Sequence, residues 1–300
     1  MAALNASLAF FFATFAVCEA ARRAARSLLP ASAWGSLARE AAGAAQLCAC
    51  GLEMTLLLEL GPWAGGFGPD LLLTLLFLLL LLHGATCAGA AAWPTVALRD
   101  FLLAKAPLPG TLLRLAAQAL GAQAAGALTR LCWARGLSEL HALQALLAAN
   151  CSWALRSPGA RGALREGTCA FLFHLALLGL RRRPAACRAP ALDLLVTVMT
   201  HTAGPSTSAF FSPALAAPLT LQCPGHNWLE HAQVYCLGPL TGMVLAVLLY
   251  QGNIPRLFQR NLLYSQKNKY RTPRGKPAPR PGDPQTPLRG RAAGSLGRAG

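Results

Sequence analysis

The sequence predicts an all-α integral membrane protein, and three observations lead to this fold class. Of the 300 residues, 54% are hydrophobic and 13% are charged, whereas a typical soluble domain carries about 25% charged residues. No Asp, Glu, Lys or Arg occurs from residue 71 to 98 or from residue 194 to 229, and both segments exceed the roughly 20 residues that a membrane helix needs. The net charge of +16 is uneven, because eleven of the 27 basic residues follow residue 255, where Asp283 is the one acid.

The charge pattern and the cysteine usage exclude several other classes. The basic C-terminal segment has no apolar core and few aromatic residues for base stacking, so nucleic acid is not an expected partner. The ten cysteines lie mostly in apolar stretches without a CxxC pair, which argues against a disulfide scaffold and a zinc site. Neither HExxH nor GxSxG occurs, so we expect no enzyme, no metal site and no cofactor.

The apolar stretches predict an extra N-terminal hydrophobic helix followed by six transmembrane helices. We interpret the uncharged residues 1–18 as an uncleaved helix, because the basic residues follow this segment, whereas a signal peptide carries them in front. The first of the six spans, 40–60, is the most polar because it contains three glutamates. The remaining spans fall within residues 71–98, 115–129, 167–180, 194–229 and 231–255.

Two of these stretches are too long for one span, and each surplus predicts a short half-helix. In both, the surplus follows an X-Pro step, at Trp93-Pro94-Thr95 and at Ser212-Pro213-Ala214. Proline suits the first position of a helix, where its missing N–H has no partner to lose. Each half-helix is therefore expected to re-enter the membrane against protein or water, because a broken backbone is not tolerated in lipid.

The two halves of the chain repeat the same order of elements. Glu40 and Glu166 open the first span of each half, and the third spans share a Leu-Gly step. Three spans per half is an odd number, so the halves are predicted to be inverted, as in transport proteins. We interpret the glycines of the third spans as positions of close helix contact; they are Gly121, Gly238 and Gly242. The chain divides into a helix with a basic linker (1–37), a membrane domain (38–255) and a basic, disordered tail (256–300).

The basic residues also predict the orientation, since cytoplasmic loops are rich in Lys and Arg. A cytosolic tail puts the basic run at 181–183 on the same side and the uncharged loop 61–68 on the opposite side. The loop between the third and fourth spans is an exception because it contains three arginines. It also carries Asn150-Cys151-Ser152, a glycosylation sequon that only a lumenal or extracellular loop can use.

These motifs resemble the aquaporin family over residues 1–276. Residues 234–242, Val-Tyr-Cys-Leu-Gly-Pro-Leu-Thr-Gly, resemble its last span, and the two X-Pro steps resemble its paired Asn-Pro-Ala boxes. Cys223, nine residues after Ala214, is similar to a mark of the superaquaporin branch. The resemblance implies a homotetramer in an intracellular membrane with one pore per subunit, which conducts water, glycerol or other small neutral solutes. It also implies that Glu40 and Glu166 accept hydrogen bonds from the loops that lead to the half-helices.

The boxes depart from the family pattern. Trp93 and Ser212 occupy the two asparagine positions, and Leu215 stands where many aquaporins carry a filter arginine. A tryptophan cannot cap a helix, because its indole only donates, and its ring either blocks the path or swings into the protein. His201, twelve residues before Pro213, lines the pore or packs in the structure. We therefore keep two alternatives: a channel, or a non-conducting membrane protein with a structural or organelle-organising role.

Overall fold

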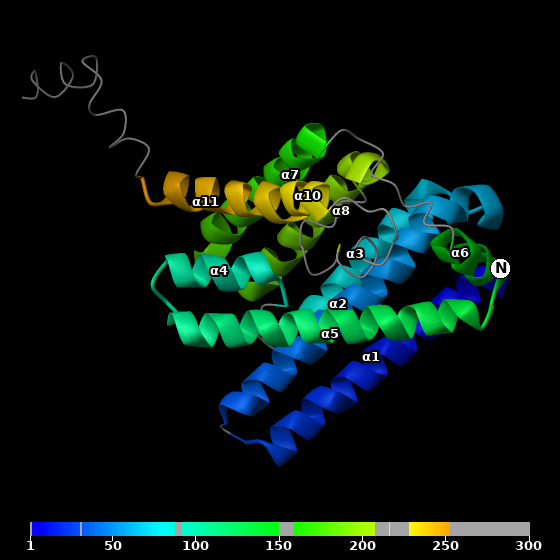
Figure 1. The fold of residues 1–300 in the computed structure, drawn as a ribbon, viewed down its shortest axis with the longest axis horizontal. Coiled ribbons are helices and arrows are strands. Elements are labelled where there is room, and N and C mark those ends of the chain that lie inside the picture. Colours follow the sequence, from blue (N-terminus) through cyan, green and yellow to red (C-terminus); the bar gives the residue numbers. More distant parts are fainter. Residues whose placement is uncertain are drawn as a thin grey trace, which may run out of the picture. The chain divides into compact units, whose positions relative to one another are not determined.

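Helices build the part of the chain that the computed structural model describes, which is residues 2–30, 32–87, 92–149, 159–207, 216 and 228–252 (Figure 1). No β-strand occurs in this part, as the sequence predicts. The unit comprising residues 255–300 lies outside it. The elements are α1 (Ala2–Leu28), α2 (Ala33–Leu60), η1 (Gly61–Gly65), α3 (Pro69–Thr86), α4 (Pro94–Leu102), α5 (Leu108–Ala134), α6 (Glu139–Ala149), α7 (Gly159–Gly179), η2 (Leu180–Arg182), α8 (Ala185–Thr207), α10 (Trp228–His231), η3 (Ala232–Leu237) and α11 (Gly238–Tyr250).

Several of these helices are long and apolar enough to cross a membrane. Five segments satisfy both criteria: α1, α2 with η1, α3, α7 with η2, and Leu229–Tyr250. The helices α5 and α8, with 27 and 23 residues, also have sufficient length for a span, although both contain charged side chains. The chain is therefore an all-α, multi-pass membrane protein.

The first helix is longer than the uncharged segment that predicts it, and continues to Leu28. Its charged end remains helical because Glu19 accepts hydrogen bonds from Arg22, Arg23 and Arg26 at 2.9–3.0 Å. Side chains three, four and seven residues apart lie on one face of a helix, so the Glu19 carboxylate offsets part of the positive charge of these three arginines. The segment interpreted as a linker thus belongs largely to α1.

Two helix pairs pack along their length, and they occupy equivalent places in the two halves. The first and third spans of the first half, α2 and α5, form one pair; α7 and α11 form the other. Glycines allow the close approach: a Cβ on Gly238 would lie 2.6 Å from the carbonyl oxygen of Ala163. A Cβ on Gly121 would overlap the backbone of Ala41, and one on Gly242 would overlap that of Gly167. Small residues at equivalent crossings agree with the internal repeat.

The helix α4 is the short element that follows the first X-Pro step. It begins at Pro94 and has nine residues, so its length of about 13 Å is less than half of the hydrocarbon thickness. Its entry is tightly bent, because Ala92 has a φ of 52°. α4 contacts α5 and α11. The second X-Pro step, with Ser212, Pro213, Ala214 and Leu215, lies outside the described residues.

Three boundaries differ from the sequence expectation. The loop before the fourth span contains α6, whose Leu140, His141 and Gln144 are buried against the bundle. The fourth span begins at Gly159, eight residues before the predicted start. The last span contains the π-helix η3 before Pro239, because proline has no N–H to continue the hydrogen-bond ladder and a wider turn accommodates it.

Candidate functional site

The N-terminus of α4 forms the first part of the candidate site. Trp93 occupies the N-cap with extended dihedrals (φ −105°, ψ 119°), and no side chain caps the helix. Its carbonyl oxygen accepts hydrogen bonds from the backbone nitrogens of Val96 and Ala97 at 3.0 and 3.3 Å. Pro94 and Thr95 are buried. The short helix thus starts inside the protein, with its positive dipole end at Trp93.

The indole of Trp93 lies against the second half of the chain. Its ring centroid is 5.4 Å from that of Phe173 on α7, at an interplanar angle of 38°. Both rings pack on a small apolar cluster that also contains Met199 and Ala203 of α8. The half-buried indole therefore links the start of α4 to α7 and α8.

Glu40 of α2 holds the residue that leads into α4. This side chain, which is 4% exposed, accepts a hydrogen bond at Oε2 from the backbone nitrogen of Ala92 at 3.3 Å. Oε2 also accepts from Gln118 at 2.8 Å, and Oε1 accepts two hydrogen bonds from Arg114 at 3.1 and 2.7 Å. One carboxylate of α2 thereby joins the half-helix entry to α5. Glu166, in the equivalent place on α7, is also fully buried.

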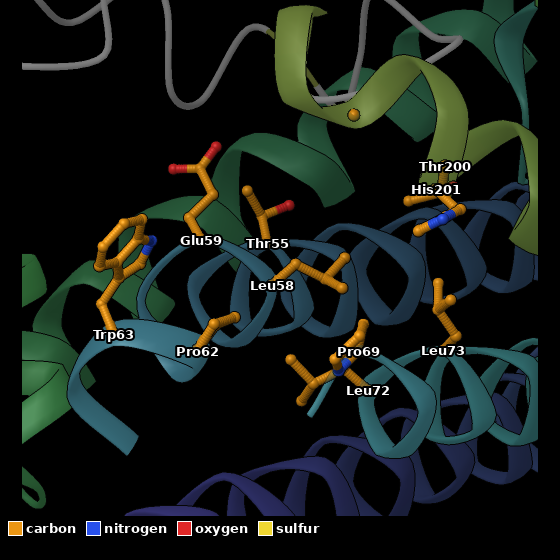
Figure 2. A pocket seen from close by; sticks show the side chains of 11 residues that line it. Thr55, Leu58, Glu59, Pro62, Trp63, Pro69, Leu72, Leu73, Thr200 and His201 are labelled. Atoms are coloured by element: carbon orange, nitrogen blue, oxygen red, sulfur yellow. The ribbon is translucent and has the colours of Figure 1, made fainter. Parts of the chain in front are cut away.

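The second part of the candidate site is a cavity of about 280 Å³ (Figure 2). We call it the outer vestibule, because the C-terminal ends of α2 and α8 and the N-terminal end of α3 surround it, on the side that the basic loops predict to be outer. His201, the predicted filter residue, is in its wall and exposed. The lining residues are Thr55, Leu58, Glu59, Pro62, Trp63, Pro69, Leu72, Leu73, Thr200, His201 and Gly204.

The polar groups of the vestibule come from two helices. Thr55 and Glu59 are one turn apart and project from the same side of α2, whereas His201 comes from α8 across the cavity (Figure 2). The rest of the wall consists of three leucines, two prolines, Trp63, Thr200 and Gly204. A few polar groups in an apolar concave wall are typical of a small-molecule site.

Sequence reasoning missed one buried polar cluster. Glu53, which is fully buried, accepts at Oε1 from Ser7 (2.6 Å) and is hydrogen-bonded there to His141 Nε2 (2.8 Å); Oε2 accepts from Trp133 Nε1 (2.8 Å). The cluster joins α1, α5 and α6 to α2. The only signal in the sequence was the acid inside an apolar span, which is a functional or structural marker by default.

Other predicted residues have no described geometry. Cys223 and Asn150 lie outside the described residues, as does the second box. Within the described ranges, no three His, Cys, Asp or Glu side chains are placed to hold a metal ion.

The paired helices, the short helix at Pro94 and the vestibule define a membrane protein of the channel class. The chain is 66% identical to Aquaporin-12 of Mus musculus over 279 residues, or 93% of this chain and 96% of that protein. It is 63% identical to Putative aquaporin-12B of Homo sapiens over 300 residues, which cover 100% and 98% of the two chains. It is also 30% identical to Aquaporin-11 of Homo sapiens over 218 residues, which cover 73% and 78%. No protein-family model matches the sequence.

The chain therefore belongs to the aquaporin family, in the superaquaporin branch that contains these relatives. Proteins of this family are membrane channels and not enzymes.

Proposed function

We propose that this channel conducts water and small neutral solutes such as glycerol. The path leads from the outer vestibule past the boxes at Trp93–Thr95 and Ser212–Ala214. The observation that carries the proposal is the nine-residue α4, which begins at Pro94 and is held at its entry by Glu40. A helix of this length beginning inside the protein is the element that a two-half-helix pore requires.

The physical basis is the field of the half-helices. Each helix N-terminus contributes about half a positive charge, which opposes cations and protons, while a neutral molecule can reorient and pass. Ser212 retains a hydroxyl that can cap its helix and donate one hydrogen bond. Leu215 carries no charge, so the filter that it shares with His201 is wider and more apolar than one with an arginine.

We also propose the assembly and the setting of this pore. Residues 38–255 form the channel domain of a homotetramer in an intracellular membrane, surrounded by lipid. The tail, residues 256–300, is cytosolic, where its charge satisfies the positive-inside rule and can contact anionic lipid. Gly121, Gly238 and Gly242 serve the packing of the domain, and Cys223 belongs to the second half-helix region.

A second candidate function is favoured by Trp93. A bulky side chain at the first box, stacked on Phe173, is compatible with a non-conducting member of the family that acts by association or membrane organisation. Conduction distinguishes the two candidates.

The experiment is stopped-flow swelling of proteoliposomes that contain the full chain or the variant Trp93→Asn. We expect both to pass water above empty vesicles, and the variant to pass more because it has a smaller side chain at the box. Conduction by the variant alone would support the non-conducting alternative. If neither protein passes water or glycerol, the channel function is wrong.

A further inference from the structure

Two membrane-spanning segments end beside each other, at Arg182 and at Tyr250. The segments Gly159–Arg182 and Leu229–Tyr250 are both long and apolar enough to cross a membrane. Their ends are in contact, because the guanidinium carbon of Arg181 lies 5.3 Å from the centre of the Tyr250 ring. Within two turns of these ends, buried side chains of both helices pack into one apolar cluster, which contains Leu178, Met243 and Val247. The two ends therefore lie at one membrane surface, on the side that the basic loops predict to be cytosolic.

Three consecutive arginines, Arg181 to Arg183, lie at this surface and are all exposed; we call them the arginine platform. Arg181 and Arg182 belong to the 3-10 helix η2, and Arg183 follows in an extended conformation. The contact between Arg181 and Tyr250 is within the range of a cation–π interaction, which holds this guanidinium in place. Among the residues that the structure describes, none forms an ion pair or a hydrogen bond with the side chain of Arg182 or Arg183. These two guanidinium groups are therefore available to a ligand.

The positive charge of the platform is not offset by acids on the helices that carry it. No Asp or Glu occurs from residue 167 to 192 or from residue 231 to 252. The helix α4, which contacts α11, carries Asp100, but that carboxylate is paired with Arg99 at 2.7 Å. An exposed charge acts over about 8 Å at physiological ionic strength, so the platform attracts anions among the headgroups that border the span.

The surface next to the platform favours a lipid over a free anion. Leu248 and Leu249, which directly precede Tyr250, are exposed on α11, so the apolar surface of the span continues up to the arginines. A guanidinium presents its N–H donors as a planar fork that matches two oxygens of a phosphate group. A phospholipid satisfies both parts of this surface, because its phosphate faces the arginines while its acyl chains cover the leucines.

We propose that Arg182 and Arg183 bind the phosphate group of an anionic phospholipid, beside the contact that fixes Arg181 on Tyr250. The site belongs to the folded part of the chain and is distinct from any lipid contact of the basic tail. It does not depend on conduction, so it stands or falls separately from the proposed channel function. Zwitterionic phospholipids are bound more weakly, because the positive group of their headgroup is repelled by the same arginines.

The test titrates the full-length protein in detergent with phosphatidylserine or phosphatidylcholine and counts the bound lipids by native mass spectrometry. The variant Arg182→Gln/Arg183→Gln removes two charges from the platform. The matched control, Arg271→Gln/Arg274→Gln, removes two arginines from the tail. Each arginine near a membrane surface contributes about fivefold to the binding of anionic lipid, so we expect the platform variant to bind phosphatidylserine about 25-fold more weakly. The tail variant is expected to stay within about twofold of the wild type, because its charges attract lipid without forming a fixed site.

The variant Arg182→Lys/Arg183→Lys separates the guanidinium fork from charge alone. Lysine keeps the charge but not the paired donors, so we expect phosphatidylserine binding between that of the wild type and that of the glutamine variant. Because both arginines are exposed, equal melting temperatures are expected for all variants. The inference is overturned if the glutamine or the lysine variant binds phosphatidylserine like the wild type, or if the tail variant loses as much as the platform variant. Displacement of the lipid by an excess of inorganic phosphate would also overturn it, since the site would then be one for a free anion.

Discussion

The carboxylate of Glu53 is expected to be one of the most sensitive positions in the protein. Substitution with alanine removes the acceptor for Ser7, His141 and Trp133, which are all fully or almost fully buried. An unsatisfied buried donor costs about 1–3 kcal/mol. The hydroxyl of Ser7 can rotate towards a backbone carbonyl, so two orphaned donors and a cavity give a destabilisation of about 4 kcal/mol.

Glutamine at the same position is expected to be much milder. Its oxygen can accept from Trp133, while its amide group donates to the hydroxyl oxygen of Ser7 and to Nε2 of His141 in the other tautomer. All three contacts then survive with neutral groups, and we expect a cost of about 1 kcal/mol. The predicted order of stability is therefore wild type, Glu53→Gln, Glu53→Ala.

Thermal unfolding of the detergent-solubilised protein measures this order. For a domain of 150–250 residues, 1 kcal/mol shifts Tm by about 2–4 °C, so we expect Tm to fall by about 8–16 °C for Glu53→Ala and by about 2–4 °C for Glu53→Gln. The exposed control Glu139→Ala should stay near the wild type. A Glu53→Ala protein that melts within 2 °C of the wild type, or a Glu53→Gln protein as unstable as Glu53→Ala, refutes the network as a source of stability.

Three further predictions concern the helix crossings and the half-helix. Gly242→Ala places a Cβ against the backbone of α7, whereas Gly84→Ala meets no atom within 4 Å. We expect thermal melts to show a large loss of stability for Gly242→Ala and none for Gly84→Ala. Equal melting temperatures for the two variants would contradict close packing at Gly242. Arg114→Met leaves the buried Glu40 without two of its hydrogen bonds, so we expect a loss of about 2 kcal/mol, which wild-type stability at neutral pH would disprove. Ala92→Gly relieves the positive φ of 52°, and a gain of about 0.5–1 kcal/mol is expected in the same melts; destabilisation would show that Ala92 is not strained.

The sequence predicts this fold to the extent that local chemistry determines it. Pro94 predicts the start of α4 because a proline at the first helical position loses no hydrogen bond, and the structure begins the helix at that residue. The uncharged segment at the N-terminus predicts α1 but not its full length, because the charged residues that follow count against a membrane span, although Glu19 pairs with three arginines within α1. α6 was missed because nothing local in the sequence shows that His141 is buried, and its partner, Glu53, lies 88 positions away on α2.

The candidate site could be predicted from the sequence to a smaller extent than the helices. Glu59 and Thr55 are unremarkable in the sequence, where Glu59 counts against a membrane span. Their significance comes from the cavity that α2 forms with α3 and α8, and contacts between distant segments are not encoded in any local pattern. The hydrogen-bond partners of the Glu40 carboxylate are an example of such distant contacts, because Arg114 and Gln118 follow Glu40 by more than 70 positions.

The structure also explains how α4 persists without an asparagine at its N-cap. A capping side chain contributes typically about 1 kcal/mol, and Trp93 supplies none. The entry is instead fixed by the hydrogen bond from Ala92 to Glu40 and by the contact between the indole and Phe173, and an aromatic pair of this kind contributes about 0.5–1.5 kcal/mol beyond its burial. These two contacts together offset the missing cap. The start of α4 therefore keeps its place without an asparagine at residue 93, because the hydrogen bond of Ala92 and the ring contact of Trp93 replace the capping side chain.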